Sequence, residues 1–344
     1  MIQRLRRRST SKIVVSIEHE EKSVAIEHAR ACALPKPWGI LDLRPWSNAR
    51  HDGVSIGEIW YERPGRVAAD SSLLLKLLFT NQPLSIQVHP DDAFAHSIGL
   101  PSGKTEAWYV LSAAAEAKVA LGLNQRLTPQ QLREAIDDGS ISDLVEWQTV
   151  SPEDVIFVPA GTIHSIGAGL VIVEIQQRSD VTFRLFDHGR QRELHIESAV
   201  AVANAGPAGF RVQPNRLTNE RTLLVSSPHF VFERINLTPN SAWCLEAERE
   251  TWLLVISGGA RVGSFDVGVG DAIFAHSDRV DIQPGPTGLV GLVAYTGGGG
   301  PIPQLLRRAK YLGAKNEGRP HEVQTPLRPQ TAASSTNGLL EINQ

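Results

Sequence analysis

Hydrophobic positions recur along the chain in short runs that are rich in β-branched and aromatic residues and are separated by glycine and proline. From about residue 35 to 190 the runs are SIGEIWYE, LLLKLLFTNQPLSIQVHP, EAWYVLS, AKVALGL, DVIFVPAG, LVIVEIQQ and VTFRLFD. From about residue 218 to 297 they are RTLLVSS, HFVFERINL, ETWLLVISG, ARVGSFDVGVGDAIFAH, RVDIQP and LVGLVAY. Many short strands at this spacing are typical of β-sandwiches and β-barrels. The pattern therefore predicts an all-β fold.

The two stretches share a faint repeat. VSPEDVIFVPAGTIH in the first stretch parallels VGVGDAIFAHSDRVD in the second, because in both an acidic turn precedes an apolar strand. The second copy lacks the Pro-x-Gly-x-x-His ending of the first. We therefore expect two related β-barrels, of which the second is degenerate.

One segment interrupts the strands with helical signals. In TPQQLREAIDDGS, Thr128 suits an N-cap and Pro129 suits the first helical position. Leu132 and Ile136 are apolar and four residues apart, so they lie on one face of a helix. These signals predict a small helical insertion at about residues 128–145, outside the barrel.

The pattern divides the chain into four regions. Residues 1–34 are a basic arm, MIQRLRRRST, and a lead-in, SVAIEHARACAL, that fits a short helix or a first strand. Residues 35–200 and 201–300 are the two barrels. Residues 301–344 are a polar tail without periodicity, which we expect to be disordered.

The composition of the chain argues against several functional classes. The 34 Lys and Arg against 37 Asp and Glu leave a net charge of −3, which argues against a nucleic-acid partner because phosphate neutralisation needs a dominant basic face. We find no signal peptide and no apolar run near the ~20 residues of a membrane helix, so we expect no membrane partner. Two distant cysteines, Cys32 and Cys244, are too few for a disulfide framework or a thiolate metal site. We expect a cytoplasmic protein; the sequence does not specify its oligomeric state.

Three polar segments of the first barrel carry candidate metal ligands. Gln87 and His89 are two residues apart in a strand and so project to the same side. Glu106 begins the apolar run EAWYVL, where a buried carboxylate is costly unless it is paired or binds a cation; a solvated strand end is the alternative. In PAGTIH the glycine permits a tight turn that directs His164 back to the barrel. Two imidazoles, an amide and a carboxylate suit Zn²⁺ or another first-row divalent ion.

Cationic and hydroxyl side chains accompany these segments. Lys76 lies within the apolar run LLLKLLF. Its ammonium either faces the same end of the barrel as the candidate metal ligands, or it is a surface lysine whose aliphatic stem is buried. Lys104 precedes Glu106 by two residues, and Ser85 precedes Gln87 by two on the same strand face. Two arginines, Arg184 and Arg190, follow the QQRSD segment.

Through LSIQVHPDD, GKTEAWYVL, PAGTIHSIGAG and QQRSDVTFRLFDHGR, the chain resembles the type I mannose-6-phosphate isomerases (phosphomannose isomerases) of the cupin superfamily, in their short bacterial form. The resemblance runs from KPWG at 36–39 to Arg190. It implies two cupin (jelly-roll β-barrel) domains, a catalytic metal-binding one at 35–200 and a degenerate one at 201–300. It also implies zinc-dependent, cytoplasmic interconversion of mannose 6-phosphate and fructose 6-phosphate. Long members of the family carry a histidine where this chain has Gly103.

The resemblance also implies roles for individual residues. It matches one zinc ion per chain to the ligands Gln87, His89, Glu106 and His164. It places at the pocket the catalytic candidates Arg184, Glu174, Lys76, Lys104 and Asp180, and the substrate-binding candidates Ser85 and Arg190. Glu174 is the first candidate for the general base because burial raises the pKa of a carboxylate, and a neutral Lys76 is the second. Arg184 is always charged, which suits an enediolate or a phosphate.

The sequence leaves the roles of several residues open. Trp38 and Trp60 are candidate sugar-stacking platforms or ordinary core aromatics. Asp91 and Asp92 orient His89 or cap a turn. The second barrel has His276 without companion ligands, so we expect it to be metal-free.

The leading functional hypothesis is a zinc-dependent isomerase of a small-molecule sugar phosphate. The alternative is a non-catalytic, sugar-phosphate-binding regulatory cupin. A metal dioxygenase fits less well, because a glutamine occupies one ligand position.

Overall fold

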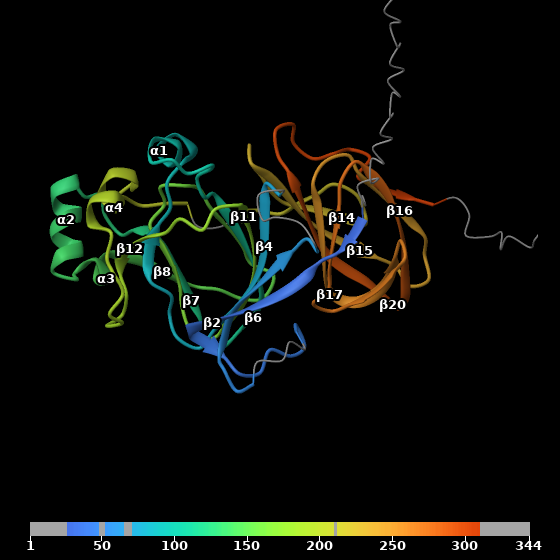
Figure 1. Ribbon diagram of the computed structural model, residues 1–344, viewed down its shortest axis with the longest axis horizontal. Helices are drawn as coiled ribbons and strands as arrows, with labels where there is room; N and C mark the ends of the chain where they lie inside the picture. Colours follow the sequence, from blue (N-terminus) through green and yellow to red (C-terminus); the bar gives the residue numbers. More distant parts are fainter. Residues whose placement is uncertain (1–25, 48–51, 65–70, 210–211, 310–344) are drawn as a thin grey trace, which may run out of the picture. The chain divides into compact units, whose positions relative to one another are not determined.

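The computed structural model describes residues 26–47, 52–64, 71–209 and 212–309. Within these ranges the fold is all-β, as the sequence predicts, and its strands form three antiparallel sheets accompanied by short helices (Figure 1). No helix in the described part is long and apolar enough to cross a membrane. The basic arm and the polar tail expected beyond residue 309 lie outside the described residues.

The first barrel consists of two sheets. The six-stranded sheet has the order β2 (Arg30–Ile40), β3 (Ile56–Glu62), β4 (Leu73–Thr80), β11 (Leu170–Gln177), β6 (Glu106–Ala113) and β9 (Val155–Val158). The five-stranded sheet has the order β12 (Phe183–Phe186), β5 (Ile86–Val88), β10 (His164–Ile166), β7 (Lys118–Leu123) and β8 (Val145–Thr149). Side chains of both sheets, Trp108 and Ile172 from the first and Val119 and Leu121 from the second among them, form one buried cluster, so the two sheets face each other across it.

Strand β4 is apolar almost throughout because both of its faces are covered. Leu75 and Leu77 belong to the cluster on the outer side of the six-stranded sheet, whereas Leu78 belongs to the barrel interior. Because side chains alternate along a strand, Lys76 shares the inner face with Leu78. Its side chain is 3% exposed, so the surface-lysine alternative is wrong.

The second barrel is a ten-stranded sheet around its own apolar core. Its main path runs β1 (Ile26–His28), β19 (Ala272–Ala275), β17 (Thr251–Val262), β20 (Asp278–Thr296), β15 (Phe230–Leu237), β14 (Arg221–Ser226) and β13 (Asn215–Arg216). Off this path, β16 (Trp243–Ala247) pairs with β20 and β21 (Leu306–Arg308), and β18 (Phe265–Gly268) pairs with β17. The core side chains come from strands all around this sheet, so the sheet closes on itself.

The two barrels share a core. The outer face of the six-stranded sheet, with Tyr61 and Leu77, packs in one buried cluster with Phe232, Trp252 and Phe274 of the second barrel. The described chain up to Ala309 is consequently one compact unit rather than two separable ones.

The ends of the described chain tie the barrels together. β1, from the expected lead-in, pairs with β19 of the second barrel, and β2 then begins the first barrel at Arg30. The lead-in therefore contains strands and no helix in its described part. Beyond residue 300, Ile302 and Leu305 are buried, so the fold continues past the boundary expected there.

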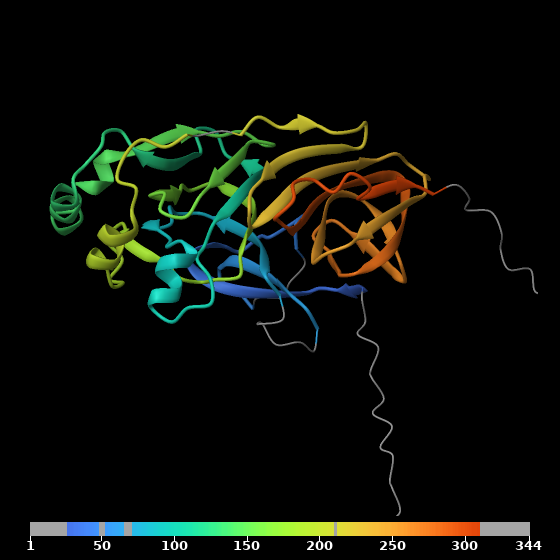
Figure 2. The same ribbon diagram turned by 90° about the horizontal axis from the view of Figure 1, so that it is seen from above.

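Helices α2 (Pro129–Asp137), α3 (Ile141–Leu144) and α4 (Ile196–Val202) lie at the end of the first barrel that is remote from the second barrel (Figures 1 and 2). Thr128 is the N-cap of α2 and Pro129 follows it, as predicted. Leu132 and Ile136 pack with Ile86 and Val88 of β5, so the helices cover the outer face of the five-stranded sheet. A further helix, α1 (Asp92–Ser97), follows β5.

Candidate active site and metal centre

The predicted metal ligands are brought together by strand pairing and by the facing of the two sheets. Gln87 of β5 and His164, the first residue of β10, are direct partners in the five-stranded sheet. Glu106 is the first residue of β6 in the facing sheet, and His89 follows the end of β5. The ligand atoms of His89, Glu106 and His164 lie within 4.8 Å of one another, and each of these residues is 1% exposed.

Both histidines present the same nitrogen to the centre. Nδ1 of His89 lies 2.8 Å from the Val181 carbonyl, and Nδ1 of His164 lies 2.8 Å from the Thr162 carbonyl. A carbonyl only accepts, so each Nδ1 carries the hydrogen and each Nε2 is left as an acceptor. Nε2 of His89 lies 3.0 Å from the Lys104 ammonium, and Nε2 of His164 lies 3.3 Å from the Gln87 amide nitrogen. Burial lowers the pKa of His164 to about 4 and that of His89 well below its usual value, helped for His89 by the charge of Lys104. Both rings are therefore held neutral, as metal ligation requires.

The geometry fits a divalent metal ion. Nε2 of His164 is 3.4 Å from Oε1 of Glu106, and Nε2 of His89 is 3.5 Å from Oε2. These atoms turn lone pairs toward one another, and the Lys104 ammonium, 3.0 Å from Nε2 of His89 and 2.9 Å from Oε2 of Glu106, is the cation of the described residues that offsets them. Nitrogen and oxygen donors of this kind suit zinc.

Gln87 can complete this set. Its amide nitrogen is 3.3 Å from Nε2 of His164, and its oxygen accepts a hydrogen bond from Ser85 at 2.9 Å. Rotation of the amide exchanges the two atoms, which are nearly indistinguishable by shape. The oxygen would then face the metal.

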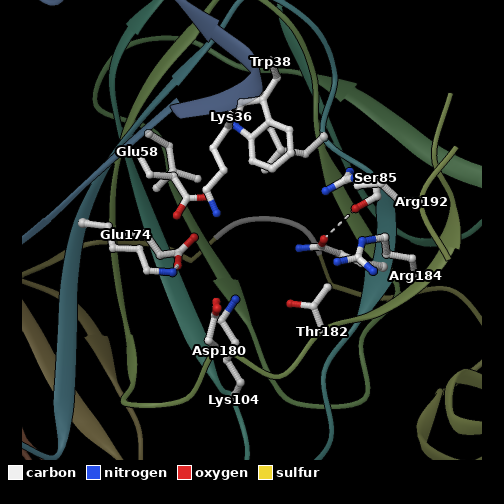
Figure 3. Close-up of a pocket in the computed structure, with 14 residues that line it drawn as sticks. Lys36, Trp38, Glu58, Ser85, Lys104, Glu174, Asp180, Thr182, Arg184 and Arg192 are labelled. Carbon is white, nitrogen blue, oxygen red and sulfur yellow. Dashed lines mark hydrogen bonds and ion pairs between the residues drawn. The ribbon is translucent and has the colours of Figure 1, made fainter. Parts of the chain in front are cut away.

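A cavity opens beside these ligands, between the two sheets (Figure 3). Seven predicted site residues line it: Trp38, Lys76, Ser85, Lys104, Glu174, Asp180 and Arg184. Gln87 lines it as well, so the ligand set borders the space that a substrate would enter. Figure 3 shows Glu58 and Glu174 on one side of the cavity and Ser85, Arg184 and Arg192 on the opposite side.

Lysines and carboxylates alternate on the first side of the cavity. Lys76 and Glu174 are cross-strand partners, and their side chains form an ion pair at 3.3 Å. The Lys76 ammonium lies 4.7 Å from the ring centre of Trp60, whose indole nitrogen donates to Glu58 at 2.6 Å. Glu58 in turn pairs with Lys36 at 3.2 Å. The Trp60 ring is therefore occupied by Lys76 and is not a free sugar platform.

The environment of Glu174 raises its pKa. Burial is the largest cause, and the nearby Glu106 carboxylate adds to it, while Lys76 and Lys104 oppose it. Oε1 of Glu174 has the Lys76 ammonium as its partner. Burial lowers the pKa of Lys104, but Glu106, 2.9 Å away, and then Glu174 outweigh it, so that pKa lies above its usual value.

Arginines occupy the opposite side of the cavity, but they are Arg184 and Arg192 rather than the expected Arg184 and Arg190. Arg184 of β12 is the cross-strand partner of Gln87 and lines the cavity. Arg190, expected to contact substrate, does not line it, because its guanidinium donates to Asp187 at 3.1 Å and to the Pro83 carbonyl at 2.9 Å. Arg192 lines the cavity instead.

The acidic pair after His89 has a structural role. Asp91 is the N-cap of α1 and accepts from the Phe94 amide at 2.8 Å. Asp92 accepts from the Gly103 amide at 2.7 Å, which ties the segment before β6 to α1. The capping alternative is thus correct for Asp91, and the Val181 carbonyl orients the His89 ring.

Gly103 is required where it stands. A Cβ at this position would lie 2.5 Å from the Pro90 carbonyl oxygen and 2.5 Å from the Asp91 carbonyl carbon. No side chain fits, so the histidine of the long family members has no counterpart in this backbone arrangement.

Four polar residues that line the cavity were missed at the sequence level: Lys36, Glu58, Thr182 and Arg192. Glu58 had a detectable signal, because it stands in the apolar run SIGEIWYE two residues from Trp60. Arg192 had none, since its approach to the cavity depends on the path of the chain after β12.

The second barrel offers no comparable centre among its described residues. The His89, Glu106 and His164 group is the one metal-binding constellation found in the described part of the chain. His276 is exposed and stands outside it.

Two β-barrels, one with a buried nitrogen-and-oxygen metal centre and a charged cavity beside it, define a cupin-like enzyme. No protein-family model matches the chain. A mannose-6-phosphate isomerase of Streptococcus mutans is 35% identical over 249 residues, covering 68% of this chain and 76% of that protein. The chain therefore belongs to the type I mannose-6-phosphate isomerase family and is an isomerase.

Solved structures show the same fold. A mannose 6-phosphate isomerase from Bacillus subtilis matches with a TM-score of 0.68 at 23% identity, covering 79% of this chain and 99% of that one. A zinc-bound mannose 6-phosphate isomerase matches with a TM-score of 0.62 at 13% identity, covering 79% and 100%.

Proposed function

We propose that this protein is a zinc-dependent aldose–ketose isomerase that interconverts mannose 6-phosphate and fructose 6-phosphate. The observation that carries the proposal is the convergence of His89, Glu106 and His164 beside a cavity whose walls are lined with lysines, carboxylates and arginines. Family membership supports the reaction, and the zinc in a structural neighbour supports the metal. We propose one zinc ion per chain and a cytoplasmic location, which agrees with two unpaired cysteines.

The reaction moves a proton between C1 and C2 of the sugar through an enediolate. It needs a base near the carbon atoms, stabilisation of negative charge on oxygen, and cations for the phosphate. When bound by Gln87, His89, Glu106 and His164, zinc would act as a Lewis acid toward the sugar oxygens.

Glu174 is our candidate for the base. It lines the cavity, it is buried, and its raised pKa brings it closer to the range in which a base works at neutral pH. Lys76, 3.3 Å away, is its counter-ion and holds the carboxylate in place.

The remaining cavity side chains complete the proposed machinery. Lys104 and Arg184 are suited to stabilise the enediolate oxygens, because both are cations beside the metal ligands. Asp180 stands at the cavity close enough to Lys104 to raise its pKa. Ser85 and Trp38 line the wall that would contact the sugar.

A regulatory sugar-phosphate binder is the second candidate, and the residues speak against it. Binding alone does not require a buried carboxylate with a raised pKa beside the metal ligands, as Glu174 has. Such a group is costly to fold and is typical of catalytic sites.

A coupled assay of mannose 6-phosphate to fructose 6-phosphate tests the proposal. We expect turnover in the metal-loaded protein, loss of turnover after a chelator, and recovery after zinc is added back. Absence of turnover with zinc bound, together with retained sugar-phosphate binding, would establish the regulatory alternative instead.

A further inference from the structure

The arginine side of the cavity differs from the lysine side in its charge balance. Each lysine that lines the described cavity has a carboxylate oxygen within 3.3 Å: Lys36 has Glu58, Lys76 has Glu174 and Lys104 has Glu106. Arg184, by contrast, makes no ion pair with a described residue, and its guanidinium donates to the Glu193 carbonyl at 3.4 Å. The positive charge available to an anion is therefore on the arginine side.

A single buried carboxylate serves two of the arginines. Asp187 is 4% exposed and accepts from Arg192 Nε at 2.7 Å and from Arg190 Nε at 3.1 Å. One negative charge cannot neutralise two guanidinium groups, so Asp187 fixes both side chains and leaves net positive charge.

Only one of the two Asp187-bound arginines can reach a ligand. Arg190 uses its terminal nitrogen on the Pro83 carbonyl and stands outside the cavity. Arg192 lines the cavity, its side chain is 30% exposed, and its guanidinium lies 5.3 Å from the ring centre of Trp38. It is thus held on one edge by Asp187 and supported on Trp38. The Arg190 guanidinium also lies 5.9 Å from the Trp38 ring centre, so what distinguishes the two arginines is that Arg192 lines the cavity.

The two arginines that line the cavity have different neighbours. Arg184 is beside the metal ligand Gln87, where C1 and C2 would react. The phosphate is attached to C6, four carbons beyond C2, and so requires a cation set back from the metal. Arg192 packs on Trp38 and is not a strand partner of a metal ligand, which makes it the candidate for that cation.

We propose that Arg192, held by Asp187 and seated on Trp38, binds the phosphate group of the substrate. Its planar guanidinium group offers paired donors that match phosphate oxygens. This inference rests on the proposed function for the identity of the sugar phosphate. It assigns the anion contact to Arg192 and not to Arg190, which the sequence favoured.

Two matched variants test the assignment. Arg192→Gln and Arg190→Gln each remove one positive charge from the same Asp187 carboxylate, but only the first removes it from the cavity. For Arg192→Gln we expect KM for mannose 6-phosphate to rise roughly ten- to hundredfold, with kcat changed by less than about threefold, since a charge-assisted contact is lost equally in ground and transition states. For Arg190→Gln we expect KM within about twofold of the parent protein. Arg192→Lys keeps the charge without the paired donors and should fall between the two.

Inorganic phosphate provides a readout that does not depend on turnover. Calorimetric titration of phosphate into the zinc-loaded protein should show weaker binding for Arg192→Gln than for Arg190→Gln, with thermal unfolding of both variants as the check on folding. Equal KM and equal phosphate affinity in the two variants would overturn the assignment, as would a larger effect at Arg190. If the parent protein fails to isomerise but binds phosphate through Arg192, the phosphate site stands and the proposed function fails.

Discussion

The two barrels of this protein have related folds but opposite interiors. The first encloses the buried ion pairs of Lys76 with Glu174 and of Lys104 with Glu106. The second is filled with aliphatic and aromatic side chains such as Val255 and Ile282. Because buried charges are costly, their concentration around the cavity of the first barrel marks the chemistry, while the second barrel contributes packing.

Charged side chains are also buried in the second barrel, and the pair of Arg221 and Glu233 shows how they differ from those of the first barrel. Glu233 is 0% exposed and accepts two hydrogen bonds from Arg221, at 2.8 and 2.7 Å, and one from Tyr295 at 2.6 Å. Arg221 also donates to the carbonyls of Ile302 and Pro303. This network is satisfied on every side and fastens the last described segment to the barrel, so it has no donor or acceptor left for a ligand.

The shared core explains how the first barrel tolerates its polar interior. Its six-stranded sheet is backed over the whole outer face of β4 by the second barrel, through Leu73, Leu75, Leu77 and Phe79. That apolar burial stabilises the strand that carries Lys76, since each buried aliphatic side chain contributes about 1.5–3 kcal/mol.

Loss of a metal ligand from the first barrel should have the largest effect on zinc content and turnover. We expect His164→Asn to lose zinc and all measurable turnover, because the substitution removes one of the two imidazoles. His276→Asn is the matched change in the second barrel, where the histidine is exposed and outside any ligand group. Elemental analysis and the coupled assay should find it equal to the parent protein; zinc and turnover surviving in His164→Asn would place the metal centre elsewhere.

Removal of the proposed base should have the next largest effect on turnover. Glu174→Gln should lower kcat by about 10²- to 10⁴-fold, the usual contribution of general base catalysis, while zinc content and KM stay close to those of the parent protein. Near-normal kcat would remove Glu174 from this role.

The pH dependence offers a second measure of the same residue. A base acts in its deprotonated form, so kcat should fall as the pH falls through the pKa of Glu174. Because burial and Glu106 raise that pKa, the fall should be centred above the ordinary carboxyl value of 4.5. In Glu174→Gln the remaining activity should lack this acid limb; an unchanged limb would assign it to another group.

The smallest effect on turnover is expected in the second barrel. Glu233→Gln leaves Arg221 as an uncompensated buried charge and should reduce the free energy of unfolding by about 3–5 kcal/mol. The folded variant should keep the kcat and KM of the parent protein. Glu197→Gln, which breaks an exposed pair with Arg133, is the control and should leave the free energy of unfolding, measured by chemical denaturation, close to that of the parent protein. A change in KM or kcat in folded Glu233→Gln would contradict a purely structural role for this barrel.

Much of the fold could be predicted from the sequence because the sequence patterns that specify its strands and the start of α2 are local. Alternating and continuous apolar runs predicted the strands, and the Thr128–Pro129 pair predicted the start of α2. The helices α1 and α4 were not predicted, since α1 has 6 residues and α4 has 7, too few for periodicity to stand out. The pairing of β1 with the second barrel was equally out of reach, because it depends on a partner some 250 residues away.

The site residues also fall into two groups, those that local sequence predicted and those that depend on tertiary contacts. The spacing of Gln87 and His89 and the turn before His164 are local features, and they pointed to residues that the structure brings together. Arg190 and Arg192 have the same charge and similar neighbours in sequence. Which one lines the cavity depends on where Asp187 and the Pro83 carbonyl lie after folding.

By itself, the sequence determined the all-β class and the candidate donors of the first barrel, because both follow from side-chain alternation and residue chemistry over a few positions. Tertiary structure alone decided that Lys76 faces the cavity, that Gly103 has no room for a side chain, and that Arg192 rather than Arg190 meets the cavity. Each of these depends on atoms from strands or loops distant in the chain, and only packing of the two sheets and the two barrels brings those atoms within contact distance.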